Sequence, residues 1–349
     1  MSSDDTRKVT KVNLELRALL PHTARFLEVC PGYERELVTA WQLGAMSFGR
    51  HPLLSLLWSR PITGRIVEFD DAVRAVMPFL KPADARGLAR RITKAGSAGF
   101  RDATSAMAEL LVAGLFARAG ADVAFVACTD EKTNDIRASR DGATVHVEVA
   151  SLNISDDNQR TETAVQQAVY AWSASSTDVP DELKGRARHS GDDSGFVRIV
   201  EYNVLPFGGG TIGQRITRLA GKKRDTQLRG VGPNTMIVNS FWHEFGVSRR
   251  EALPTYQGHT GVVFAATYGL REDPILDGFR WDGQDTSTDS VKHPGILPRS
   301  NVLSGVAWLF HLGGPVVFER LDGTPHFNDE ARRLVRDALD AGDCYSRFR

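Results

Sequence analysis

One stretch of the chain, residues 102–153, constrains the fold more than any other. It reads DATSAMAELLVAGLFARAGADVAFVACTDEKTNDIRASRDGATVHVEVASLN. Its first part has apolar residues at helical spacing, with Asp102 or Thr104 placed to cap the start and Gly120 supplying a left-handed stop. This pattern predicts a helix with one mostly apolar face, and Glu109 lies within the apolar run.

Three strands are predicted to follow this helix, at residues 123–128, 134–139 and 144–150. Asp141-Gly142 is a strong signal for a tight hairpin between the second and the third. The third strand alternates, so Glu148 and Ala150 face the side opposite to its three valines. In a hairpin centred on Asp141-Gly142, Asp135 approaches Glu148 across the ladder.

Two carboxylates that converge in this way repel each other unless a cation lies between them. Hard oxygen ligands at such a geometry suit Mg²⁺ or Mn²⁺. The ion would polarise a phosphate and lower the pKa of a bound water. The hairpin therefore predicts a divalent-metal site at Asp135 and Glu148.

The order of these acids resembles the PD-(D/E)xK nuclease superfamily, which has the restriction-endonuclease-like fold. The resemblance rests on Glu109 in the helix, then Asp135, and then Glu148 in the hairpin. Gln166 and Tyr170 add Q-x-x-x-Y on the next predicted helix, as in several nuclease branches of the superfamily. The resemblance implies an α/β fold with a mixed central sheet flanked by helices. It also implies a metal-dependent endonuclease that hydrolyses DNA, with a role in restriction or phage defence.

The resemblance assigns a role to each of these residues. Asp135 and Glu148, with the backbone carbonyl of Val149, would hold Mg²⁺ or Mn²⁺. Glu109 would hold a second metal or a metal-bound water, and the amide of Gln166 would lie near that water or a phosphate. Capping-box spacing makes a helix cap the alternative role for Gln166. For the acids, the alternative is ordinary carboxylates on a protein surface.

One position departs from the family pattern. The catalytic lysine of the family belongs two residues after Glu148, where this chain has Ala150. Either the natural protein is a non-cleaving relative, or an engineered Lys→Ala change has silenced a nuclease. The agreement of the surrounding VHVEVxSLN with the family pattern favours the second interpretation. A third is that another lysine takes its place, supplied by Lys132, Lys222 or Lys223.

Basic residues elsewhere are candidates for phosphate contacts. Residues 211–228 predict a helix with a basic stripe, formed by Arg215, Arg218 and Lys222 and followed by Lys223. A second basic run lies near residue 90 and comprises Arg86, Arg90, Arg91, Lys94 and Arg101. For both groups, a solvated helix face is the alternative interpretation.

The remaining sequence predicts two parts. Residues 1–100 are expected to form a helical N-terminal module, with helices at 12–29, 33–47, 70–79 and 83–94. Residues 101–349 are expected to form the nuclease-like domain, with further strands at 197–204, 235–239, 261–268, 302–312 and 315–320. Loops are predicted at 176–195 and 271–300, and a closing helix at 328–341.

The amino-acid composition limits the kinds of function that this protein can have. The 43 basic and 43 acidic residues cancel, which counts mildly against a non-specific nucleic-acid coat but does not exclude a nuclease. The polar N-terminus, the lack of a long apolar run and three scattered cysteines predict a cytoplasmic protein outside the membrane. Symmetric cleavage of duplex DNA would favour a homodimer. A non-cleaving nucleic-acid-binding protein and a regulatory α/β protein are the alternative functions.

Overall fold

The computed structural model describes residues 3–45, 51–58, 63–94, 97–126, 134–151, 187–192, 195–200, 233–239, 249–253, 262–268, 296–310, 314–320 and 327–339. Several sequence predictions fall outside these residues. They are the helix with Gln166 and Tyr170, the basic stripe of Arg215, Arg218, Lys222 and Lys223, and the alternative lysine Lys132.

The first part of the chain is helical, as predicted. Its elements are α1 (Ser3–Leu19), α2 (Pro21–Leu27), α3 (Tyr33–Ala45), α4 (Pro52–Trp58), α5 (Thr63–Val76), the 3₁₀ turn η2 (Met77–Phe79) and α6 (Pro82–Thr93). The single helix predicted over residues 12–29 is wrong, because Pro21 begins a new helix there. Proline lacks an amide hydrogen and is disfavoured inside a helix, but it suits the first helical position. The short α4 was not predicted.

Helix α7 (Ser97–Arg118) connects the helical part to the sheet. The predicted start at Asp102 or Thr104 is wrong, since the helix begins at Ser97 and Asp102 instead pairs with Lys94 at 3.0 Å. The predicted stop is confirmed, because Gly120 has φ +80°. Gly114 allows α7 to approach α5 closely, since a Cβ there would lie 2.3 Å from the carbonyl oxygen of Ala72.

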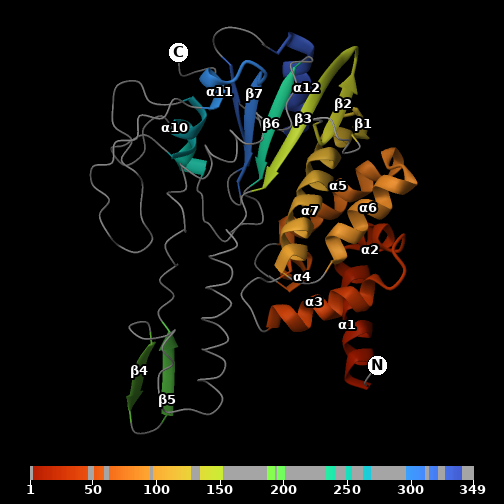
Figure 1. The fold of residues 1–349 in the computed structure, drawn as a ribbon, viewed down its shortest axis with the longest axis vertical. Coiled ribbons are helices and arrows are strands. Elements are labelled where there is room, and N and C mark those ends of the chain that lie inside the picture. Colours follow the sequence, from red (N-terminus) through yellow and green to blue (C-terminus); the bar gives the residue numbers. More distant parts are fainter. Residues whose placement is uncertain are drawn as a thin grey trace.

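A six-stranded mixed sheet follows, in the order β1-β2-β3-β6-β7-β8 (Figure 1). Its strands are β1 (Asp122–Phe125), β2 (Ile136–Arg140), β3 (Ala143–Ser151), β6 (Asn234–Asn239), β7 (Gly305–Leu309) and β8 (Val316–Glu319). Strands β3, β6 and β7 are parallel, and the other neighbouring pairs are antiparallel. The predicted hairpin is confirmed, with φ of 52° at Asp141 and 81° at Gly142.

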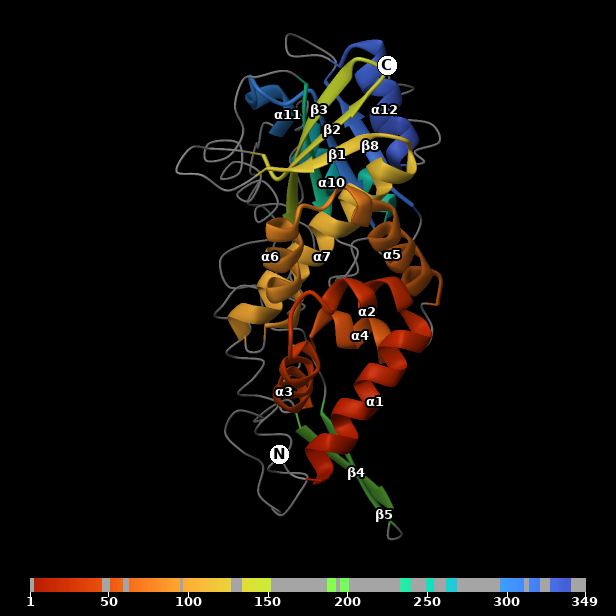
Figure 2. The ribbon, with the colours of Figure 1, turned by 90° about the vertical axis from the view of Figure 1, so that its right-hand side faces the viewer.

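Helices cover both faces of this sheet. Helices α7 and α12 (Asp329–Leu339) pack on the face that carries the three β3 valines. Helix α10 (Val262–Tyr268) lies on the other face, where the indole nitrogen of Trp308 donates a hydrogen bond to the hydroxyl of Thr267 at 3.2 Å. Next to α10 are α11 (Ile296–Arg299) and the 3₁₀ turn η4 (Arg249–Ala252). Figure 2 shows α11 and α12 on opposite sides of the strands.

The strand predicted at 261–268 is therefore wrong, because these residues form α10. Its buried positions, Val263, Ala266 and Thr267, follow the i, i+3, i+4 spacing of one helix face. Short apolar runs do not distinguish a buried strand from a buried helix. The strands predicted at 235–239, 302–312 and 315–320 are confirmed as β6, β7 and β8 with shifted ends, and the closing helix as α12.

A separate two-stranded hairpin is formed by β4 (Ala187–Asp192) and β5 (Gly195–Val200). The loop predicted over 176–195 is thus wrong for residues 187–192. The main hydrophobic core, in contrast, is continuous from α1 through α7 to β3 and α12. The boundary predicted at residue 100 lies inside α7, whose side chains belong to that continuous core.

Candidate functional site

The β2–β3 hairpin brings Asp135 to the strand that carries Glu148. Ile136 pairs with Val147, so the next position in the ladder sets Asp135 opposite Glu148. The Oδ2 atom of Asp135 accepts a hydrogen bond from the backbone amide of Val149 at 2.8 Å. This bond anchors the carboxylate beside Glu148 and Val149, as the sequence predicted for the two acids.

The backbone of β3 explains why Val149 meets Asp135. The amide of His146 donates to the carbonyl of Pro233 at 2.9 Å, on the β6 side of the strand. Because bonding directions alternate along a strand, residues 146, 148 and 150 direct their backbone groups to β6 and Val149 directs its own to the β2 side. The carbonyl of Val149 therefore lies on the same side of the strand as the Asp135 carboxylate.

Glu148 and Ala150 are both fully buried on the same face of β3. The carboxylate of Glu148 is thus removed from solvent, in surroundings where it attracts a cation more strongly than it would in water. A side chain at position 150 lies two residues along the same face. A lysine there would be close to Glu148.

Glu109 has a different environment. Both of its oxygens accept hydrogen bonds from Arg91 of α6, at 2.7 and 2.8 Å. The side chain of Glu109 is 12% exposed and that of Arg91 is 39% exposed, so the pair is partly shielded. Helix α7, which carries Glu109, packs on the valine face of β3, whereas Glu148 alternates to the opposite face of that strand.

Arg91 links this pair to Asp135. Burial lowers the pKa of Arg91, but the hydrogen bonds and charge of Glu109 outweigh burial, and Asp135 and Asp102 add to the effect. The pKa of Arg91 is therefore raised above its ordinary value. Arg91 was predicted only as part of a basic run, because two residues 18 positions apart in the chain carry no local signal for this pairing.

Buried amides support the residue before Asp135. The side-chain nitrogen of Asn134 donates to the side-chain oxygen of Asn234 at 3.0 Å, and Asn234 donates in turn to the carbonyl of Val302 at 3.0 Å. Both asparagines are buried. This relay connects the start of β2 to β6 and to the segment before β7, and it was not recognised in the sequence.

The donor set at the hairpin is chemically suited to Mg²⁺, which proteins commonly hold with one or two carboxylates and water. In the part of the chain that the structure describes, no group of three His, Cys, Asp or Glu side chains gathers as a metal cluster. The described residues also include no helix long and apolar enough to cross a membrane. Comparison of the chain with protein-family models, curated proteins and solved structures finds no match.

Proposed function

We propose that this chain is a metal-dependent endonuclease with a restriction-endonuclease-like fold, silenced at position 150, whose substrate is DNA. The observation that supports it best is the anchoring of Asp135 on the amide of Val149, beside the fully buried Glu148. Glu109 lies on helix α7, Asp135 directly precedes β2, and Glu148 lies on β3, which pairs with the parallel strand β6. The α/β fold with its mixed sheet is consistent with the proposal.

Mg²⁺ or Mn²⁺ would be held by Asp135, Glu148 and the carbonyl of Val149. The bound ion would supply positive charge that polarises a phosphate and acidifies a water. The hydrogen bond from Val149 fixes one oxygen of Asp135 and leaves the other to face Glu148 or a ligand. A site held by strand backbone is rigid, and a preorganised site loses little free energy to reorganisation during the reaction.

Glu109 acts through Arg91 in this proposal. Because both oxygens of Glu109 are bonded to Arg91, its expected role in holding a second metal requires that ion pair to open. With the pair closed, Glu109 holds the guanidinium near Asp135. This places a permanent positive charge beside the site in a chain whose family lysine is replaced by Ala150.

The test compares the chain with its Ala150→Lys variant on plasmid and single-stranded DNA, in Mg²⁺, Mn²⁺ or EDTA. We expect cleavage only by the lysine form and only with metal. An Ala150→Lys/Asp135→Asn variant should be inactive, which excludes a contaminating nuclease. Because position 150 is fully buried, a thermal melt must first show that the lysine form is folded.

The alternative is a nucleic-acid-binding protein that does not cleave. Ala150 is fully buried within β3 and pairs in register with Val238, so the strand accommodates a small side chain there. That observation favours Ala150 as the native residue. A folded lysine form that binds DNA without cutting it in any metal would contradict the nuclease proposal and support this alternative.

A further inference from the structure

We propose that the exposed face of α6 is a docking surface for the phosphate backbone of DNA and directs that backbone to the hairpin site. The α6 surface is defined by Arg86 and Arg90 on the helix, with Lys81 and Lys94 flanking its two ends and Arg91 at its edge. The inference rests on the proposed function for its substrate class. The surface contains most of the second basic run predicted from the sequence. The other predicted group, the basic stripe that begins at Arg215, lies outside the described residues.

Helix α6 has two distinct faces. Its buried face packs against the neighbouring helices and consists of Ala85, Leu88, Ala89, Ile92 and Thr93. Its other face is exposed and basic, and Arg86 and Arg90 lie one turn apart, about 6 Å along the helix axis. Like charges at this spacing destabilise a helix slightly, whereas Arg90 also lies in the last turn, where a cation is favoured by the helix dipole.

Lys81, Arg86, Arg90 and Lys94 of this surface are exposed. Lys81, Arg86 and Arg90 form no ion pair with any residue that the structure describes. Lys94 differs, because it is paired with Asp102 at 3.0 Å. In a chain with no net charge, a group of basic side chains without an ion-pair partner among the described residues is a local positive potential that attracts polyanions.

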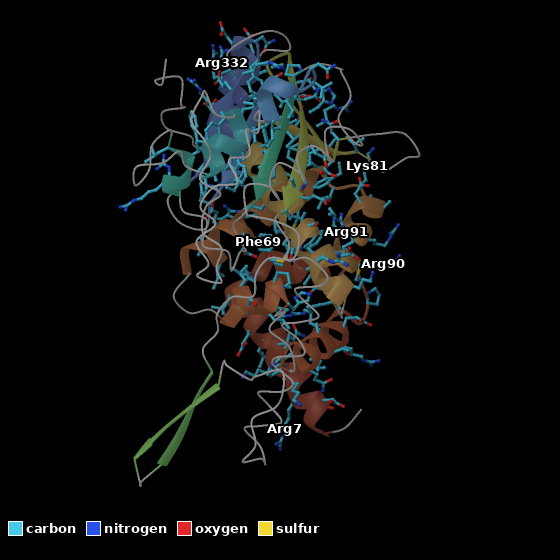
Figure 3. The ribbon with its side chains drawn as sticks, turned by 60° about the vertical axis from the view of Figure 1, so that its left-hand side comes forward. Arg7, Phe69, Lys81, Arg90, Arg91 and Arg332 are labelled. Atoms are coloured by element: carbon cyan, nitrogen blue, oxygen red, sulfur yellow. The ribbon has the colours of Figure 1, made fainter. Side chains whose placement is uncertain are left out.

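Arg91 connects this surface to the hairpin site. It follows Arg90 on α6 and pairs with Glu109, and its side chain keeps 39% of its surface exposed. Figure 3 places Lys81, Arg90 and Arg91 on one side of the molecule. A phosphate backbone bound to Arg86 and Arg90 would next meet Arg91, whose charge interacts with Asp135 at the hairpin site.

Gly87 lies at the centre of this surface, where the lack of a side chain would let the DNA backbone come close to helix α6. A glycine within an exposed helix destabilises it relative to alanine. No packing requirement accounts for it, because a Cβ at Gly87 would meet nothing within 4 Å. The absent side chain leaves the helix backbone accessible between Arg86 and Arg90.

The composition of the surface favours nucleic acid over a membrane. Helices that bind membrane surfaces combine basic residues with an apolar face that enters the lipid. The apolar face of α6 is instead buried in the protein core, against the neighbouring helices. What remains outside is suited to phosphates that lie on a solvent-exposed polymer.

The test is the salt dependence of DNA binding by the full chain, measured in EDTA by fluorescence anisotropy with a labelled duplex. Arg86→Gln/Arg90→Gln is compared with Arg35→Gln/Arg333→Gln, which removes two exposed arginines from α3 and α12. In the α6 variant we expect the negative slope of log K against log salt to become shallower by about 2. Its affinity for the duplex at 0.1 M salt should fall roughly 60-fold. The control should bind like the parent chain, and Arg86→Lys/Arg90→Lys should retain most of the affinity.

Each outcome decides the inference separately from the nuclease proposal. Loss of binding in the α6 variant supports the surface even if no lysine form ever cuts DNA. Equal binding by the α6 variant and the control overturns it, even if Ala150→Lys is an active nuclease. Absence of DNA binding by the parent chain also overturns it, as does α6-dependent binding to vesicles of anionic phospholipid without binding to DNA. Because both arginines are exposed, the melting temperature should not change.

Discussion

Three carboxylates that look equivalent in the sequence have three different environments. Asp135 is held by a backbone amide, Glu148 is fully buried, and Glu109 is bonded by both oxygens to a guanidinium. A cation competes for Glu109 only by displacing Arg91, whereas Asp135 is held by the backbone amide of Val149 beside Glu148. At the residue scale, the hairpin acids are therefore the better candidates for metal ligands.

His51 is fully buried and hydrogen-bonded to the backbone of α6. Its Nε2 atom donates to the carbonyl of Ile92 at 2.6 Å, and burial lowers its pKa to about 4. The folded state thus keeps the imidazole neutral, while the unfolded chain protonates it below its ordinary pKa of about 6.5. Above that pH the protonation of His51 does not change the stability, and stability is lost as the pH falls from about 6.5 towards 4.

We expect the free energy of unfolding to fall by about 1.3 kcal/mol between pH 7.5 and 5.5 on account of His51 alone. Urea unfolding at both pH values measures it, with His51→Gln as the comparison. The variant is expected to be less stable at pH 7.5 but to show a smaller loss on acidification. Equal losses in the two proteins would show that His51 is not the titrating group.

At the element scale, a carboxylate from α5 caps the start of α2. Leu20, at the N-cap position, makes no side-chain cap hydrogen bond. Instead Asp70 accepts from the amide and hydroxyl of Thr23, both at 2.8 Å, and from the amide of His22 at 3.2 Å. A helix start carries unsatisfied amides and a partial positive charge, so a buried acid there stabilises both helices at once.

Asp70→Ala should lower the free energy of unfolding by about 2–4 kcal/mol, since it removes three hydrogen bonds and leaves buried donors unsatisfied. Its neighbour Asp71 provides the control, because its ion pair with Arg74 lies on the surface. Asp71→Ala should cost about 0.5 kcal/mol or less. Chemical denaturation of both variants measures the difference, and similar losses would contradict the capping role.

The elements that the sequence predicted well depend on local signals. The β2–β3 hairpin follows from two adjacent residues, Asp141 and Gly142, which are of the types that most readily adopt the positive φ a tight turn requires. Helix α10 was predicted as a strand because a run of seven mostly apolar residues is too short to reveal its period. The restriction-endonuclease-like fold and the metal site stay predictions, whereas the mixed sheet with helices is confirmed.

Contacts between distant elements could not be read from the sequence. Arg91 and Glu109 meet because α6 packs across α7, and Asn134 meets Asn234 across 100 residues of chain. Each of these partners is an ordinary polar residue in its own segment. Their pairing depends on how the helices and strands pack, which a single sequence does not encode in any local pattern.

At the scale of the whole molecule, the helical part and the sheet share one hydrophobic core through α7. Arg140 adds a polar connection, donating to the carbonyl of Ala119 at 2.7 Å and to Asp337 of α12 at 2.6 Å. Ligand binding at the hairpin is therefore expected to stabilise this shared core, because β3 and α7 are part of it. A thermal melt of the whole chain becomes a test of metal binding that needs no catalytic activity.

We expect Mg²⁺ at ten times its dissociation constant to stabilise the chain by about 1.4 kcal/mol and to raise the melting temperature by a few degrees. Asp135→Asn should abolish this rise, because it removes a proposed ligand. Asp141→Asn removes a carboxylate from the same hairpin at its exposed turn, so it should leave the rise unchanged. A melting temperature that does not respond to Mg²⁺ or Mn²⁺ would favour the regulatory α/β alternative, in which the acids bind no metal. An equal rise in all three proteins would place the metal elsewhere in the molecule.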